Sequence, residues 1–433
     1  MLVDTEDLEK LAETCLETAR ILKQYLASAG QPQPTFDQDG PAIYPDLPPD
    51  VQFAQLKLRE ASLRLHNLAA SPDFPVTNYP YFALNDLNAL RYITTYGIAK
   101  HVPLKNAISY PDLAAATGTD ITQLKQMIRQ ACQNRVFTEK AGKVAHTAAS
   151  KALLSKSAGA MAEYISIDSW HYISNQINAI EKWGHGSQEP TQTPYNAACN
   201  SDLPLFIYYE NQPLVRERFA NVMSWAASMP AMSRDYIARG FDWPSLGAGK
   251  VVDVAGNMGQ CSVEIAKANP KLSIIVQDLP GVIDLAKDPK SSIVPPEYQQ
   301  NFTFMAHDMF KPQPINDADV YFYRMVFHNQ SNKYGLKLLE ALLPAMKSGA
   351  RLLITDQVLP PVDAAPAVIE RFMRSQDLQM RTLLNAQQRD LEQWTELFAQ
   401  ADRRLKIKNV VSLPGSIMSF IEVAIEETAN GFI

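Results

Sequence analysis

The chain has 433 residues and a formal net charge of −6. Its 46% hydrophobic and 20% charged residues are ordinary for a globular protein and exclude a chain that is disordered throughout. At roughly 150 residues per domain, this length predicts two or three domains. The negative charge argues against a protein whose main partner is nucleic acid, because such proteins usually present a basic surface.

The four cysteines, Cys15, Cys132, Cys199 and Cys261, form no CxxC pair. They therefore predict neither a zinc site nor a disulfide framework. The acidic start MLVDTEDLEK lacks the order of a signal peptide, and no run of about 18 apolar residues predicts a membrane span. We expect a cytoplasmic protein with no metal and no membrane contact.

Residues 4–29 carry apolar side chains at spacings of three and four, which predicts a helix. The polar, proline-bearing residues 30–50 predict an extended linker. A second helical pattern covers residues 51–70. The pattern over residues 81–157 predicts three helices and a small hairpin.

Turn signals divide this last segment. Asp112 is expected to begin a short helix, Gly118 to break it and Asp120 to cap the next helix. A hairpin turning at Gly142 would be the wing of a winged helix. Between residues 100 and 156 there are nine Lys and Arg against three Asp and Glu. DNA binding therefore stays an alternative to a dimerisation domain with a solvated basic face.

Residues 159–245 predict a mostly helical segment rich in aromatic residues and methionine. Most of these side chains are expected in the core, and some can line an apolar pocket. The candidate pocket residues, two of them from further along the chain, are Trp170, His171, Phe206, Met223, Met373 and Asp377.

From residue 250 strands and helices alternate. The expected strands cover residues 250–256, 272–280, 302–310, 318–326 and 350–360, and a long amphipathic helix covers residues 332–349. This rhythm predicts an α/β, Rossmann-like domain with a mostly parallel sheet and helices on both faces. Ligands of such sheets bind at the carboxyl ends of the strands.

The first of these strands runs into the loop DVAGNMG. Gly256 and Gly259 in this loop allow close approach of a ligand to the backbone. Asp278 ends the second strand, where a carboxylate can accept both hydroxyls of a ribose. The pattern favours an adenosine-containing cofactor over a loop without ligand.

The order DVAGNMG, QDLPGVI, HDMF and YFYRMVFHNQSNKYG resembles the plant caffeate-type and fungal O-methyltransferases over about residues 80–425. The likeness is closest to fungal members that act on natural products. It implies S-adenosyl-L-methionine as cofactor and a homodimer. It also implies a winged-helix dimerisation domain over residues 51–185, after a helix and linker over 1–50, and a methyltransferase domain over 186–433.

The resemblance implies a role for each motif residue. The cofactor residues are Asp253, Ala255, Gly256 and Gly259 at the methionine end, Asp278 and Leu279 at the ribose, Asp308 and Met309 at the adenine, and Arg324 nearby. The catalytic residues are His328 as general base, Asp356 as its orienting acid and Gln388 at the position of a second acid. A histidine suits this task because it can accept the proton of a phenol while a group behind it fixes its tautomer.

Four residues depart from the family pattern: Ala255 and Asn257 in the glycine loop, Gln330 after the base, and Gln388. We expect O-methylation of a phenol or enol of fungal-type secondary metabolism. Because of the departures, a methyltransferase-like pericyclase stays an alternative, in which His171, His328, Arg324 and Gln388 would donate hydrogen bonds to a carbonyl. A DNA-binding winged-helix regulator is the third alternative.

Overall fold

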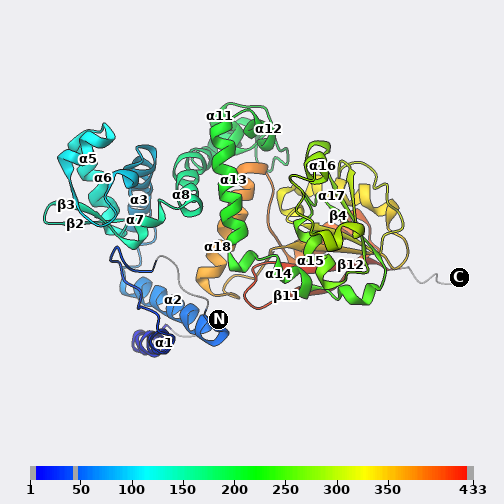
Figure 1. Ribbon diagram of the computed structural model, residues 1–433, viewed down its shortest axis with the longest axis horizontal. Helices are drawn as coiled ribbons and strands as arrows, with labels where there is room; N and C mark the ends of the chain where they lie inside the picture. Colours follow the sequence, from blue (N-terminus) through cyan, green and yellow to red (C-terminus); the bar gives the residue numbers. More distant parts are fainter. Residues whose placement is uncertain (1–5, 42–46, 427–433) are drawn as a thin grey trace. The chain divides into compact units, whose positions relative to one another are not determined.

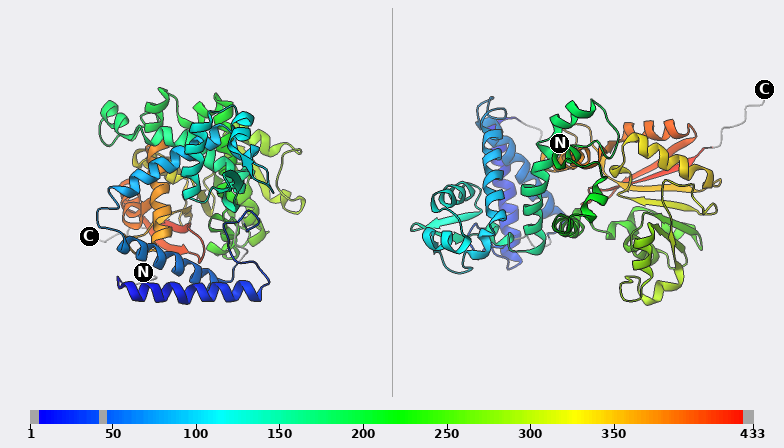
Figure 2. Two further views of the ribbon diagram at one scale, coloured as in Figure 1. Left: turned by 90° about the vertical axis from the view of Figure 1, so that its left-hand side faces the viewer. Right: turned by 90° about the horizontal axis from the view of Figure 1, so that it is seen from above.

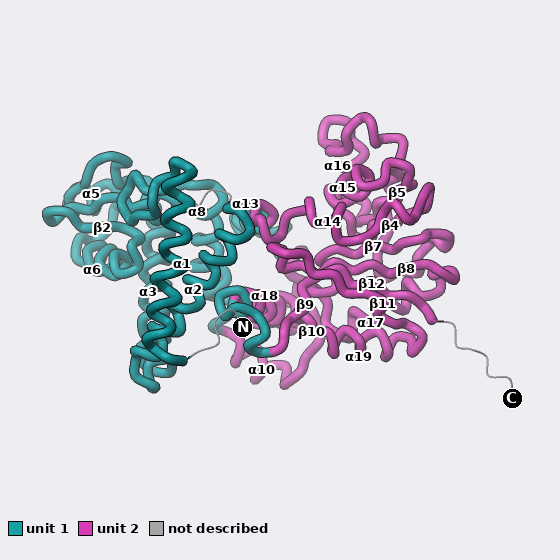
Figure 3. The backbone as a smooth tube through the Cα atoms, turned by 90° about the horizontal axis from the view of Figure 1, so that it is seen from below, with its two compact units in different colours: residues 1–174, 208–226, 362–371 teal, residues 175–207, 227–361, 372–433 magenta. Residues whose placement is uncertain are grey.

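The computed structural model describes residues 6–41 and 47–426 (Figure 1). The first two residues of the helix expected over 4–29, and residues 42–46 of the expected linker, lie outside this part. The chain forms two compact units (Figure 3). Unit 1 comprises residues 1–174, 208–226 and 362–371, and unit 2 comprises 175–207, 227–361 and 372–433.

Unit 1 begins with two long helices that pack side by side, α1 (Leu8–Ser28) and α2 (Pro49–Ala69) (Figure 2). The Asp7 side chain caps α1 by accepting a hydrogen bond from the Lys10 N–H. Leu22 and Leu26 of α1 are buried with Val51 of α2. Both expected helices are confirmed.

A small three-stranded antiparallel sheet follows, with strand order β1–β3–β2. The three strands and the helices around them are α3 (Asn78–Thr95), α4 (Ile98–His101), β1 (Ile108–Ser109), α5 (Tyr110–Thr117), α6 (Ile121–Gln133), β2 (Phe137–Lys140), β3 (Lys143–His146) and α7 (Ala148–Ala152). The hairpin turns through Ala141 and Gly142, both with positive φ, as a two-residue turn requires. The hairpin and the cap at Asp120 are confirmed. The expected start at Asp112 is wrong, because Ser109 caps α5, which begins at Tyr110.

The middle of the chain is helical, as expected. It contains α8 (Lys156–Glu163), the π-helix η1 (Tyr164–Ser169), α9 (Trp170–Ile173), α10 (Gln176–Trp183), α11 (Pro194–Cys199), α12 (Leu205–Glu210), α13 (Pro213–Ser228), η2 (Pro230–Met232), α14 (Asp235–Gly240) and η3 (Trp243–Leu246).

Unit 2 contains a seven-stranded sheet of order β11–β12–β8–β7–β4–β5–β6. Its strands are β4 (Lys250–Val254), β5 (Ser273–Asp278), β6 (Phe302–Ala306), β7 (Val320–Arg324), β8 (Arg351–Asp356), β11 (Leu405–Ser412) and β12 (Ser419–Ile425). The first five are parallel and confirm the five expected strands. The antiparallel pair β11–β12 was not expected from the sequence.

The connecting elements are α15 (Gln260–Ala268), α16 (Pro280–Lys287), η4 (Pro296–Asn301), η5 (Phe327–Asn329), α17 (Asn332–Leu342), η6 (Leu343–Ala345), β9 (Val358–Leu359), α18 (Ala367–Leu384), β10 (Arg389–Asp390) and α19 (Leu391–Ala401). The helix expected over 332–349 is too long. The α-helix ends at Leu342, and a 3₁₀ turn containing Pro344 follows, since proline cannot donate a helical hydrogen bond.

Alternate strand residues bury the two faces of this sheet. Val252 and Val254 of β4 face the core formed with α17 and α19, whereas Val251 faces the core that includes α15. Figure 3 shows α15 and α16 on one side of the sheet and α17 and α19 on the other. The predicted two-sided α/β architecture is confirmed.

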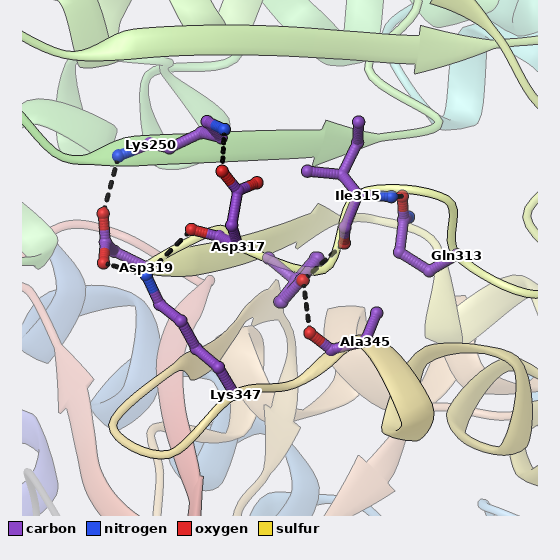
Figure 4. A network of polar contacts seen from close by, with 8 residues as sticks. Lys250, Gln313, Ile315, Asp317, Asp319, Ala345 and Lys347 are labelled. Carbon is purple, nitrogen blue, oxygen red and sulfur yellow. Dashed lines mark hydrogen bonds and ion pairs between the residues drawn. The ribbon is translucent and has the colours of Figure 1, made fainter.

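Charged groups clamp the amino edge of this sheet (Figure 4). The Asp319 carboxylate accepts from the backbone N–H of Lys250 at 2.7 Å and pairs with Lys347 at 2.9 Å. Asp317 pairs with the Lys250 side chain. These groups tie β4, the start of β7 and the turn before β8 together, away from the carboxyl edge.

Candidate active site

The loop after β4 is shaped by a buried acid. Asp253 is 2% exposed and accepts a hydrogen bond from the Ser262 hydroxyl at 2.6 Å. A Cβ atom on Gly256 would lie 2.6–2.9 Å from the atoms of this carboxyl group. Ala255 and Asn257 adopt the positive φ angles instead, at 56° and 55°. Gly256 is therefore required by close approach, and the replaced glycines at 255 and 257 do not prevent the turn.

The Asp253 carboxyl group sits in a low-dielectric environment. Burial raises its pKa to about 7, against the opposing effects of the Ser262 hydroxyl and the charge of Arg324. Arg324 is the last residue of β7, and its guanidinium donates to the carbonyl of Met232 at 3.1 Å. Arg324 thus lies close enough to the loop after β4 to influence its buried acid.

Asp278 ends β5 beside this loop. One of its carboxylate oxygens accepts from the Asn257 N–H and the other from the Leu279 N–H, each at 2.8 Å. The end of the neighbouring strand β6 lies beside Asp278. The N–H of His307, directly after β6, donates to the Asp278 carbonyl at 2.9 Å. Asp308 follows and accepts from the Phe310 N–H at 3.0 Å. The two predicted acids thus lie at neighbouring strand ends.

His328 lies in η5, directly after β7, with 8% of its surface exposed. Its backbone N–H donates to Asp356 Oδ2 at 3.2 Å, and Asp356 Oδ1 is 3.9 Å from His328 Nδ1. Gln388 is nearer to the ring, with Nε2 at 3.1 Å from Nδ1. The Gln388 N–H in turn donates to Asp377 Oδ1 at 2.8 Å. The structure brings together the three predicted catalytic residues and one predicted pocket residue.

Burial disfavours the charged forms of His328 and Asp356. Burial, and then the charges of Arg389 and Arg324, lower the pKa of His328 to about 4. Burial raises the pKa of Asp356 to about 7. Among the described residues, neither Asp356 Oδ1 nor Gln388 Oε1 has a hydrogen-bond partner. Two buried oxygens without a partner beside one imidazole make this cluster a candidate functional site.

Arg389 supports the same loop and was not predicted from the sequence. It is fully buried, and its guanidinium donates to the carbonyls of Phe327 and Gln330 at 2.9 and 2.8 Å and to the side chain of Asn332. Burial lowers its pKa to about 10. The only signal in the sequence was its place directly after Gln388.

The expected pocket residues divide between the units. Trp170, His171 and Met223 belong to unit 1, and Phe206, Met373 and Asp377 belong to unit 2. In unit 1, Trp170 lines a cavity of about 270 Å³ with residues of α3.

A second cavity, of about 220 Å³, lies within unit 2. It is lined by residues of α10, by the loop 184–192, by Arg381 of α18 and by Asn385 directly after α18. Asn385 holds this loop by donating to the carbonyls of Glu189 and Gln192, each at 2.9 Å. The loop is also bonded to α17, because the Ser331 hydroxyl donates to the carbonyl of Gln188. The cavity thus lies on the helix that carries Asp377.

Two features are absent from residues 6–41 and 47–426. No three His, Cys, Asp or Glu side chains gather so that they could hold a metal ion. No helix in this part is long and apolar enough to cross a membrane.

Residues 182–403 match the model of the O-methyltransferase domain family. The O-methyltransferase aoiF of Aspergillus oryzae is 35% identical, over 96% of this chain and 99% of its own. The O-methyltransferase bik3 of Gibberella fujikuroi is 33% identical, over 96% and 93%.

The chain belongs to the O-methyltransferase family. Its cofactor is S-adenosyl-L-methionine. The resemblance stated from the motifs is thereby confirmed.

Solved structures share the fold of this O-methyltransferase. OxaC, in complex with SAH and oxaline, aligns with a TM-score of 0.71 at 20% identity, over 97% of this chain and 99% of its own. LepI, in complex with SAM, gives 0.69 at 19%, over 96% and 100%. A structure described as a pericyclic reaction enzyme gives 0.67 at 19%, over the same shares. At these identities the likeness concerns the fold alone.

Proposed function

We propose that the protein transfers the methyl group of S-adenosyl-L-methionine to a phenol or enol hydroxyl of a small natural product of fungal secondary metabolism. One observation carries the proposal. His328, Asp356 and Gln388 form a buried cluster at the carboxyl edge of the sheet that also presents Asp253 and Asp278. The fungal relatives named as O-methyltransferases support the same reaction.

The residues present fit the cofactor. The absence of a side chain at Gly256 lets the loop that begins at Ala255 pass close to Asp253, and the loop is assigned to the methionine end of the cofactor. Asp278 uses one lone pair of each oxygen on the backbone, and a carboxylate has further lone pairs for the two ribose hydroxyls. The residues assigned to the remaining groups are Leu279 at the ribose, Asp308 and Met309 at the adenine, and Arg324 near the methionine end. When bound, S-adenosyl-L-methionine supplies a methyl group activated by its sulfonium charge.

His328 is the proposed general base. Its Nε2 atom accepts the hydroxyl proton only if the other nitrogen, Nδ1, carries the ring proton. The terminal amide of Gln388 can turn over without a change of shape, so that its carbonyl accepts this proton. Asp356 fixes the loop through the backbone N–H of His328.

His328→Ala tests this role. The variant should form no S-adenosylhomocysteine with a substrate that the native enzyme methylates, while its affinity for the cofactor stays nearly native. Exposed His101→Ala serves as control and should keep full activity. Unchanged turnover of His328→Ala would remove His328 as the base.

A pericyclase is the second candidate, and the present orientation of Gln388 favours it. With Gln388 Nε2–H donating to Nδ1, the ring proton of a neutral His328 lies on Nε2, where it can be donated to a substrate carbonyl. The reaction would then give a product of unchanged formula, or one that lacks only water, and no S-adenosylhomocysteine. Mass spectrometry of the products distinguishes the two candidates.

We also propose that the three-stranded sheet with α5 and α6 is a winged-helix domain that serves a homodimer. Its basic face would then be solvated and would bind no nucleic acid. A monomer by light scattering at micromolar concentration would contradict the dimer, and salt-sensitive retention on DNA would favour a regulator. The domain boundaries at 50 and 185 and the cytoplasmic location stay predictions.

A further inference from the structure

The side-chain group nearest to His328 Nδ1 is neutral, and the Asp356 carboxyl oxygen lies further away, at 3.9 Å. This group is the side-chain amide of Gln388, the residue before β10, and its Nε2 atom lies 3.1 Å from Nδ1. Two cations act against a charged ring: Arg324 at the end of β7 and Arg389 in β10. The acids are Asp356 at the end of β8 and Asp377 on α18, and burial raises the pKa of both.

We propose that this site is built for an acidic hydroxyl, that is, an enol or phenol conjugated to an electron-withdrawing carbonyl, and that Gln388 sets this preference. The inference rests on the methyl transfer proposed above and names its substrate class.

The strength of the base leads to the same conclusion. A simple phenol has a pKa near 10, and burial with two arginines holds the pKa of His328 at about 4. Each unit by which a substrate is more acidic favours proton transfer about tenfold, so a simple phenol is a poor proton donor to this buried base. A carboxylate at position 388 would have opposed this effect. With Gln388, the acidity must come from the substrate.

The cations that weaken the base favour the ionised substrate. The Arg324 guanidinium has five N–H donors, and the structure pairs one of them with the Met232 carbonyl, which fixes the group at the strand end. An oxyanion beside His328 would feel the charges of Arg324 and Arg389 in a buried setting, where they act strongly.

The step balances with this substrate. The hydroxyl proton passes to His328 Nε2 as the substrate ionises in the site, and the oxygen then forms a bond to the methyl carbon. The carbon–sulfur bond breaks, and its electron pair stays on sulfur, which becomes a neutral thioether. His328 then releases the proton to solvent. No metal or oxidant is needed.

Two phenols of similar size test the inference: 4-nitrophenol, which is acidic, and 4-isopropylphenol, which is not. The first readout is binding, which is monitored through the visible absorption band of 4-nitrophenolate between pH 5 and 9. Binding should lower the apparent pKa of 4-nitrophenol in the native protein. Gln388→Glu should abolish this shift, because a second carboxylate disfavours the anion. Gln393→Glu adds the same charge at the start of α19, where Gln393 caps the helix and Glu caps equally well, and it should keep the shift.

The second readout is S-adenosylhomocysteine formation. The native enzyme should favour 4-nitrophenol over 4-isopropylphenol by at least about tenfold in kcat/KM. Gln388→Glu should narrow this ratio, because it strengthens the base. No shift of the bound nitrophenol, or equal rates for both phenols, would overturn the inference while leaving methyl transfer in place. A shift toward the anion without any S-adenosylhomocysteine from either phenol would instead overturn the proposed methyl transfer.

Discussion

Gly256 lies where any side chain would meet the carboxyl group of Asp253. Gly256→Ala places a methyl group within 2.6–2.9 Å of that carboxyl group, so the loop or the acid must move. We expect a loss of about tenfold or more in cofactor affinity, measured by calorimetric titration. Gly281→Ala is the matched control, because nothing lies within 4 Å of its added Cβ. Native affinity in Gly256→Ala would show that the loop tolerates the methyl group.

Asp356 links the site to the pH dependence of stability. Its pKa is about 7 in the folded protein and near 4 in the unfolded chain, so the folded state binds the proton more tightly. The native protein therefore loses stability as pH rises from about 4 to 7, and Asp356→Asn, which stays neutral, loses none from this position. The melting temperature of the variant should rise relative to the native protein between pH 5 and 8. An equal difference in melting temperature between variant and native protein at pH 5 and at pH 8 would contradict the raised pKa of Asp356.

Most of the candidate site could be predicted from single residues. Asp253, Asp278, Asp308 and Asp356 end β-branched or aromatic runs, or directly follow them, and such positions meet at one edge of a parallel sheet. Arg389 could not be predicted, because an arginine in a polar segment is normally exposed. Its burial depends on the carbonyls that η5 and the residues after it turn toward it.

At the scale of elements, Arg389 joins β10 to the turn that carries His328. Its donors hold the carbonyls of Phe327 and Gln330, on both sides of the base. Arg389→Lys retains the charge and loses the fork of donors. We expect kcat to fall about tenfold or more, while KM for the cofactor stays unchanged. The pH below which the rate falls should also stay the same, because the lysine retains the positive charge.

The measurement is a full pH–rate profile of Arg389→Lys beside the native enzyme. If the role were only structural, Arg389→Lys would lose folded protein and keep the native kcat per folded molecule. A melting curve separates these outcomes.

The elements followed from the sequence where the pattern was regular. The βα alternation predicted the five parallel strands, because each strand is a short apolar run between turns. The hairpin β11–β12 was missed, since Lys408 and Asn409 stand side by side and break the alternation of β11, where the register with β12 shifts. Such polar residues are typical of sheet edges.

At the scale of the whole molecule, each unit has its own core, and both units contain candidate residues of the substrate pocket. Aromatic and methionine content predicted apolar side chains but could not assign Trp170 and His171 to unit 1 and Met373 to unit 2. That division depends on contacts distant in sequence. The proposed cofactor site, in contrast, lies wholly within unit 2, so it can be tested without knowledge of the substrate.

Calorimetric titration of cofactor-free protein with S-adenosyl-L-methionine tests the central claim most directly. The account predicts micromolar or tighter binding, lost in Asp278→Ala because the ribose loses its carboxylate. Absence of binding in the native protein, after mass spectrometry has excluded carried-over cofactor, would contradict methyl transfer at this site.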